Sequence, residues 1–221
     1  MRLSRFDNRP GHQPAFTSRE LLLVIVTVGF LLLLILPAIL PPPEPGHLSI
    51  LCEFNLKQVG LAARIWAADN QDRFPMEFST NLGGTRELVG PADAFRHFQV
   101  MSNCLNTPRI LVCPDDRERT PGTNFLWDLN NNHLSYFINL DACQTNRSQL
   151  LSGDRFLTNG TPLRQGMMTL VPSQPVKWTR VLHPHGNNVL MSDDSVRRLD
   201  STGFDQLVSE IPNSTNHLLF P

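Results

Sequence analysis

The sequence predicts an α+β protein, in which a long N-terminal hydrophobic helix continues into an amphipathic helix that packs on a small antiparallel sheet with long loops. Three observations support this prediction. Residues 21–40 contain no charged side chain, residues 50–66 carry apolar side chains at three- and four-residue spacings, and short apolar segments follow between loop-forming residues. A chain of 221 residues is long enough for one moderate domain and an appendage.

The composition limits the function before any motif is considered. The formal net charge is −1, so no overall electrostatic argument favours nucleic acid as a partner. The cysteines Cys52, Cys104, Cys113 and Cys143 show neither a Cys-x-x-Cys pair nor metal-finger spacing. The sequence therefore leaves open one or two disulfides, with three possible full pairings, or four buried thiols.

The N-terminal segment has the features of a membrane anchor. Residues 1–15 carry three arginines and one acidic residue, and the uncharged run 21–40 follows. As a helix, about 20 residues rise roughly 30 Å, which is the thickness of a bilayer's hydrocarbon core. The run is longer than the apolar region of an ordinary signal peptide, and it ends in a proline cluster. The positive-inside rule then predicts a cytoplasmic N-terminus, with residues 45–221 outside.

Glu20 lies at the cytoplasmic edge of this span, where a carboxylate costs free energy unless it meets a cation. The adjacent Arg19 points in another direction on a helix and pairs poorly with it. The segment "AFTSRELLLVIVTVGFLLLLILPAI" resembles the N-terminal cleavage and methylation segment of type IV prepilins and type II secretion pseudopilins. In this resemblance Ala15 ends the leader, Phe16 begins the mature chain and Glu20 is its fifth residue. Pro37 falls on a proline that family members often carry within the helix.

The resemblance implies a route of processing and assembly. A prepilin peptidase would cut between Ala15 and Phe16 on the cytoplasmic face and methylate the new amine. Residues 1–15 would be the leader, and residues 16–40 a transmembrane and assembly helix in the bacterial inner membrane. Glu20 would pair with the N-terminal amine of a neighbouring pilin or pseudopilin subunit. The alternative is a simple signal anchor in which this glutamate has no such role.

Residues 41–70 are expected to form a proline break and an amphipathic stalk helix, which ends before Pro75. The segment "CEFNLKQVGLAARIWAADNQDRFP" resembles pseudopilin-like proteins of planctomycete and verrucomicrobial type. The positions that match its two motifs are Cys52, Asn55, Leu56, Lys57, Gln58 and Gly60, then Asp69, Asn70, Asp72, Phe74 and Pro75. The oxygen ligands at 69–72 also suit calcium, but short acidic turns commonly end helices, which favours a solvated turn.

Residues 71–221 are expected to form an extracytoplasmic domain of short strands between long loops. One candidate strand is "HLSYFINL", in which Leu134, Tyr136 and Ile138 would share one face and Phe137 would lie on the other. The further candidates "RILVCPDD" and "LLSGDRF" resemble the Cys-Pro-x-Asp and Leu-x-Gly-Asp-Arg strands of the same pseudopilin-like family.

A β-hairpin near residues 187–199 is predicted, because apolar runs flank Asp193 and Asp194. The segment resembles the prepilin-processing-associated C-terminal motif, a histidine followed after nine residues by Asp-Gly. His183 and Asp193 match this motif, and Asp194 stands in the glycine position. A left-handed turn costs Asp about 1 kcal/mol more than Gly. A His–Asp hydrogen bond is expected to hold the turn.

The expected function is structural: a pilin-like or pseudopilin subunit of a type II secretion or type IV pilus-like system, with no catalytic residue, cofactor, metal or nucleic-acid partner. One competing hypothesis is a signal-anchored extracytoplasmic binding module that does not polymerise. Another is a metal-dependent hydrolase that uses His183, His185 and Asp193, because histidines two residues apart project the same way from an extended chain. The sequence carries no HExxH, GxSxG or Walker signature beside them.

Overall fold

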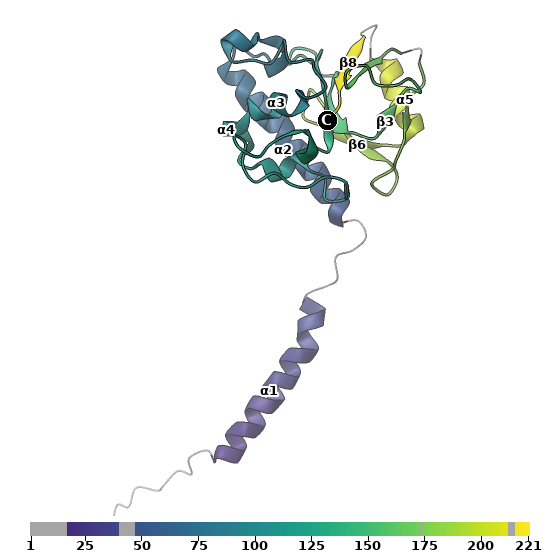
Figure 1. The fold of residues 1–221 in the computed structure, drawn as a ribbon. Helices are drawn as coiled ribbons and strands as arrows, with labels where there is room; N and C mark the ends of the chain where they lie inside the picture. The colour runs from purple at the N-terminus through teal and green to yellow at the C-terminus, as the bar shows by residue number, and fades with distance from the viewer. Residues whose placement is uncertain (1–16, 40–46, 173, 212–214) are drawn as a thin grey trace, which may run out of the picture. The chain divides into compact units, whose positions relative to one another are not determined.

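A computed structural model describes residues 17–39, 47–172, 174–211 and 215–221 of the chain (Figure 1). The chain divides into two compact units, Met1–Glu44 and Pro45–Pro221. The first unit contains helix α1 (Ser18–Ile39), and the second contains the other described helices and the strands. The predicted α+β class is confirmed, with an N-terminal apolar helix and a six-stranded antiparallel sheet.

Helix α1 consists almost entirely of apolar residues. The stretch Ser18–Ile35 has a mean hydropathy of 2.3, and it is long and apolar enough to cross a membrane. A signal sequence near an N-terminus has the same property. Pro37 lies within α1, two residues before the helix ends at Ile39.

Helix α2 (His47–Asp69) buries one face in the second unit. The buried side chains recur at three- and four-residue spacings, as an amphipathic helix requires. They are Cys52, Leu56, Val59, Ala62, Ala63, Trp66 and Ala67. The helix ends as predicted near residues 69–70, where the Asn70 side chain donates a 2.7 Å hydrogen bond to the Trp66 carbonyl. Gln71 and Asp72 then have positive φ angles, which turn the chain away from the helix axis.

Residues 75–133 form short helices, where η denotes a 3-10 helix. They are η1 (Pro75–Glu77), η2 (Thr80–Leu82), α3 (Ala94–Gln99), α4 (Ser102–Leu105), η3 (Pro108–Leu111) and η4 (Asn131–His133). The prediction that "RILVCPDD" is a strand is therefore wrong. Thr107 caps η3 by accepting a hydrogen bond from the Arg109 N–H, and Pro108 suits the first helical position. The apolar run reflects the burial of Ile110 and Leu111 rather than strand pairing.

The central sheet has six strands, and every neighbouring pair is antiparallel. Their order across the sheet is β4 (Met167–Leu170), β8 (Asn216–Leu219), β1 (Tyr136–Asn139), β2 (Leu150–Asp154), β6 (Asn187–Met191) and β7 (Val196–Leu199). The predicted strands "HLSYFINL" and "LLSGDRF" contain β1 and β2, and the predicted hairpin is the β6–β7 pair. A separate two-stranded sheet pairs β3 (Leu157–Thr158) with β5 (Lys177–Trp178).

Strands β1, β2 and β6 of the central sheet are buried on both faces, and the sheet lies between α2 and helix α5 (Ser201–Glu210) (Figure 1). Tyr136 and Ile138 pack into the core shared with α2, whereas Phe137 packs into the core shared with α5. The predicted alternation along this strand is therefore confirmed. Helix α5 lies outside the predicted elements, and the Asp200 side chain caps it by accepting a 2.7 Å hydrogen bond from the Gly203 N–H.

Candidate functional site

Four segments that are far apart in the sequence bring five polar or sulfur-bearing side chains together in the second unit. We call Cys52, Cys113, Asp115, Asp154 and His183 the polar cluster. Helix α2 contributes Cys52, the loop after η3 contributes Cys113 and Asp115, β2 contributes Asp154, and the turn before β6 contributes His183. All of them except Asp115 are buried. Buried groups of this kind require partners, because an unpaired charge in a low-dielectric interior is costly.

A disulfide between Cys52 and Cys113 joins α2 to the loop after η3. The two residues are 61 positions apart, so the bridge closes a long loop of the unfolded chain. The loss of unfolded-state entropy from such a loop corresponds to about 4 kcal/mol of stability. Cys104 and Cys143 are thiols. Of the alternatives that the sequence left open, the structure contains one disulfide and two thiols.

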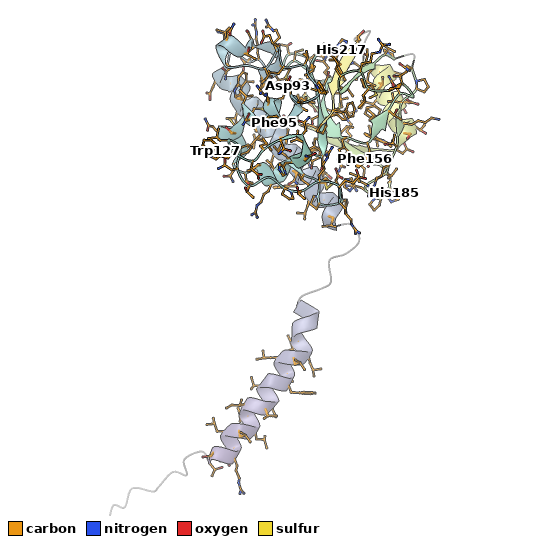
Figure 2. All side chains as sticks on the ribbon, viewed as in Figure 1. Asp93, Phe95, Trp127, Phe156, His185 and His217 are labelled. Carbon is orange, nitrogen blue, oxygen red and sulfur yellow. A yellow bond between two sulfur atoms is a disulfide. The ribbon has the colours of Figure 1, made fainter. Side chains whose placement is uncertain are left out.

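The segment 183–186 is a tight turn that buries one histidine and exposes another. The Gly186 N–H donates a 3.2 Å hydrogen bond to the His183 carbonyl, and Gly186 has a φ of 136°. A Cβ atom at this position would lie 2.2 Å from the Leu199 carbonyl oxygen, so only glycine fits. His183 is buried, whereas His185 is exposed at the edge of the unit (Figure 2). The expectation that both histidines project the same way is wrong, because the chain turns instead of extending.

The imidazole of His183 lies between two carboxylates. Its Nδ1 atom is 2.9 Å from Asp115 Oδ2, and its Nε2 atom is 3.5 Å from Asp154 Oδ2. Nε2 is also 3.5 Å from the Sγ atom of Cys113. The expected His–Asp hydrogen bond is therefore present, but its carboxylate belongs to Asp115, a residue outside the predicted set of site residues.

Asp154 is the most deeply buried carboxylate of the polar cluster, with none of its surface exposed. Its Oδ2 atom accepts a 2.7 Å hydrogen bond from the Asn188 N–H. Its Oδ1 atom has no hydrogen-bond partner among the residues that the structure describes. Burial raises the pKa of the Asp154 carboxyl above its ordinary value, although His183 and the Asn188 N–H oppose this shift.

Beside the polar cluster, Arg155 binds two carboxylates. Its Nε atom donates a 2.8 Å hydrogen bond to Asp116 Oδ2, and its guanidinium also contacts Glu118. Burial favours the neutral form of Asp116. The hydrogen bonds and charge of Arg155, together with the Ser135 side chain and a hydrogen bond from the Glu118 N–H, outweigh burial and hold the pKa of Asp116 below its ordinary value. Arg180 pairs with Glu118 at 2.7 Å, and both arginines lie over the ring of Phe156. This arrangement fixes the loop after η3 to the end of β2.

The predicted motif residue Gly60 lies where α2 meets the β6–β7 hairpin. A Cβ atom at Gly60 would lie 3.0 Å from Leu190 Cδ1 and 3.2 Å from Asp194 Oδ1. Asp194 has a φ of 68°, which is the left-handed conformation that its glycine position in the motif requires. The side chain of Arg64 on α2 forms an ion pair with Asp194. Asp193 instead serves the turn itself, because its Oδ1 atom accepts a 2.9 Å hydrogen bond from the Ser195 N–H.

The other predicted positions on α2 divide between its two faces. Asn55 donates a 3.2 Å hydrogen bond to the Val112 carbonyl, which ties the helix to the residue before Cys113. Leu56 is buried in the core. Lys57 pairs with Glu53 at 2.6 Å on the helix surface, and Gln58 is half-buried. Asp69, the last residue of α2, and Asp72, in the loop that follows, are both exposed.

The start of α1 forms a capping box. The Thr17 N–H and hydroxyl each donate a 2.8 Å hydrogen bond to Glu20 Oε2, and the Glu20 N–H donates a 3.4 Å bond to the Thr17 hydroxyl. Glu20 therefore has a structural role within its own helix, and the sequence Thr-Ser-Arg-Glu carried the signal for it. The predicted cleavage junction, Ala15 and Phe16, lies outside the described residues.

Both N-terminal helices expose apolar side chains. Along α1, every described side chain from Ser18 to Ile35 is exposed (Figure 2). On α2, one stripe of large apolar side chains lies opposite the buried face. It consists of Ile50, Phe54, Leu61 and Ile65, which are 44% to 62% exposed. The predicted apolar periodicity of α2 therefore combines two faces, one buried and one exposed.

The polar cluster contains residues that sequence reasoning did not select, although a signal for them existed. Asp115 and Asp154 lie within the "CPDD" and "SGDR" segments, which were assigned to strands rather than to a site. Only the fold brings these segments together. Strand β2 pairs with β6, and His183 before β6 lies 3.5 Å from both Asp154 Oδ2 on β2 and the disulfide-bonded Cys113 Sγ. Comparison of the chain with family models, with curated proteins and with solved structures finds no match.

Proposed function

We propose that this chain is a structural, pilin-like subunit of a type II secretion or type IV pilus-like system. It would be anchored in the bacterial inner membrane, with a cytoplasmic N-terminus and residues 71–221 on the other side. A prepilin peptidase would remove residues 1–15 and methylate Phe16. Assembly with other pilin or pseudopilin subunits would proceed through α1, without catalysis, cofactor or nucleic acid.

The observation that carries this proposal is the start of α1. A long apolar helix with a carboxylate in its first turn is what a subunit needs if it packs beside an N-terminal amine at membrane depth. Both capping hydrogen bonds from Thr17 go to Oε2 of Glu20. A carboxylate has a second oxygen and a full negative charge, so the cap leaves it able to bind a neighbour's amine.

The exposed stripe on α2 supports the same proposal. Large apolar side chains at positions 50 and 54, and again at 61 and 65, lie on one side of a helix whose opposite face is buried, with Lys57 between the two pairs. Exposed apolar patches on soluble domains commonly mark surfaces that bind other proteins. An assembly that packs α1 helices together would bring α2 helices close to one another, because only residues 40–46 separate the two helices.

Two substitutions separate the capping role of Glu20 from its charge. Glu20→Gln keeps the capping box, since glutamine serves at this position, but removes the charge. Thr17→Ala removes the cap and keeps the charge. We expect Glu20→Gln to insert into the membrane normally. We expect the yield of cross-linked assemblies from native membranes to fall about tenfold, which corresponds to about 1.4 kcal/mol of association free energy. We expect Thr17→Ala to assemble.

Chemical cross-linking in native membranes, followed by mass spectrometry of the captured subunits, measures this assembly for copies of this chain and for other pilin-like subunits. Unchanged assembly of Glu20→Gln would exclude the proposed pairing and favour the signal-anchored binding module. N-terminal mass spectrometry of the membrane-extracted protein checks the processing step: a methylated Phe16 supports the proposal, and an intact Met1 contradicts it.

A further inference from the structure

The polar cluster holds a set of atoms that a transition metal can bind. One ligand atom each from Cys52, Cys113, Asp115 and His183 lies within 4.8 Å of the others. Thiolate sulfur, imidazole nitrogen and carboxylate oxygen are the ligands that zinc takes in proteins. The residues come from three separate segments, so a bound ion would connect α2 with the loop after η3 and the turn before β6.

The orientation of His183 suits a metal on one of its two nitrogens. Oδ2 of Asp115 lies 2.9 Å from Nδ1 of His183. The other ring nitrogen, Nε2, faces the sulfur of Cys113 at a distance of 3.5 Å. A tetrahedral zinc ion with Zn–N and Zn–S distances of about 2.0 and 2.3 Å places its nitrogen and sulfur ligands about 3.5 Å apart. A carboxylate on the far nitrogen is the usual partner that orients a metal-bound histidine.

Asp154 lies beside the same nitrogen of His183 that faces the sulfur of Cys113. Its Oδ2 atom is 3.5 Å from the same Nε2 atom, and its Oδ1 atom has no hydrogen-bond partner among the described residues. The side chain is fully buried. A buried carboxylate with an unused oxygen is costly, and a cation beside it would remove that cost.

We propose that the chain with reduced cysteines holds one zinc ion on Cys52, Cys113, His183 and Asp154, with Asp115 as the residue that orients His183. In the oxidised chain the two sulfur atoms are bonded to each other and are not thiolate ligands. The disulfide and the zinc ion are therefore alternative cross-links of the same two segments. A dithiol reductant supplies two electrons and two protons to the disulfide and becomes oxidised itself. Zinc binding then releases both thiol protons.

Cobalt substitution tests this site directly. The full-length chain in detergent, reduced with a phosphine, is titrated with Co²⁺ while its absorption spectrum is recorded. We expect one Co²⁺ per chain, with the visible bands of tetrahedral cobalt and a sulfur-to-metal charge-transfer band, and we expect Zn²⁺ to remove both. The oxidised chain serves as the control and should give neither band. Bands in the oxidised chain, or none in the reduced chain, would overturn the proposal.

Matched variants then assign the ligands. Cys104→Ser with Cys143→Ser removes the two remaining thiols and should leave the spectrum unchanged. Asp115→Asn keeps the hydrogen bond to His183 and should weaken Co²⁺ binding about 10- to 100-fold without shifting the bands. Asp154→Asn removes a ligand and should shift them. Identical spectra for the Asp154→Asn variant and the wild type would remove Asp154 from the site.

A wild-type experiment covers the case in which a variant does not fold. One equivalent of Zn²⁺ should protect two of the four cysteines of the reduced chain from alkylation, and peptide mass spectrometry should identify them as Cys52 and Cys113. Protection of the other pair, or of none, contradicts the proposal, as does a reduced chain that remains unfolded with Zn²⁺. This site does not depend on membrane assembly, so its failure would leave the proposed function untouched.

Discussion

His97 is a buried histidine whose two ring nitrogens are both hydrogen-bonded in the neutral form. Its Nε2–H donates a 2.8 Å bond to the Leu88 carbonyl, so Nδ1 accepts the 2.8 Å bond from the Thr85 hydroxyl. Burial lowers the pKa of His97 below its ordinary value, and the opposing effects of the Leu88 carbonyl and of Asp93 are smaller. The folded chain therefore binds a proton here less readily than the unfolded chain does.

This difference predicts a loss of stability on acidification. The contribution of His97 is fully present above the unfolded pKa of about 6.5, and it is lost as the pH falls below this value towards the folded pKa. One group of this kind changes the free energy of unfolding by at most about 1.4 kcal/mol per pH unit. Thermal unfolding of the chain in detergent between pH 7.5 and 5.5 measures the slope. The variant His97→Gln should show a shallower slope, and an equal slope would contradict the assignment.

Individual residues differ in how far the sequence could predict them. The positive φ of Asp194 was foreseeable from the glycine that its motif position calls for, because that position implies a left-handed turn. The ion pair between Asp194 and Arg64 could not be predicted, because it joins residues 130 positions apart. The partner of His183 was unpredictable for the same reason: Asp115 lies 68 positions away.

At the level of elements, α2 depends on a close approach to the β6–β7 hairpin. Gly60 permits this approach, because the atoms nearest to a Cβ there belong to Leu190 and Asp194. We expect Gly60→Val to cost about 1–3 kcal/mol, since the added methyl groups must displace a buried leucine. Denaturant unfolding followed by tryptophan fluorescence measures this loss.

The adjacent substitution Leu61→Val is the matched control for Gly60→Val. It places the same residue type on the exposed face of the same helix, and it should change stability by no more than about 0.5 kcal/mol. Valine is a better helix former than glycine, so helix propensity does not explain a loss at Gly60. Equal losses at both positions would contradict a cost set by the contact with the hairpin.

Elements with a long periodic pattern were predictable, and short apolar runs were not. Helix α2 extends over 23 residues, and its end follows from the polar turn and Pro75. The four-residue helix η3 is too short for a period to distinguish it from a strand, and its local capping by Thr107 decides its conformation. Helix α5 has Phe204, Leu207 and Val208 on one face, which is the pattern that would have revealed it.

For the whole second unit, the disulfide is the covalent link between α2 and the loop after η3. Removing it with Cys52→Ala and Cys113→Ala together should lower the free energy of unfolding by about 4 kcal/mol in the presence of a metal chelator. The pair Cys104→Ala and Cys143→Ala should leave it nearly unchanged. Denaturant titration of both double variants makes the comparison, and equal losses would contradict the role given to the disulfide.

The strand order of the whole unit lies beyond sequence reasoning. Alternating side chains along β1 predicted a strand with Phe137 on one face and Tyr136 and Ile138 on the other, but they could not identify β8 and β2 as its neighbours. Pairings such as β1 with β8 join residues about 80 positions apart, and no local pattern of residues encodes them. The polar cluster depends on this order, which explains why His183 was predicted without Asp115 and Asp154 beside it.

The position of β8 also has a consequence for biosynthesis. Residues 216–219 follow every other described strand in the chain, yet they lie between β4 and β1 inside the sheet. A ribosome or a translocation channel that still holds these residues keeps the sheet split into a separate strand β4 and a group of four strands. Both cores then remain open until synthesis or export has passed residue 219, so complete folding of this unit has to wait for β8.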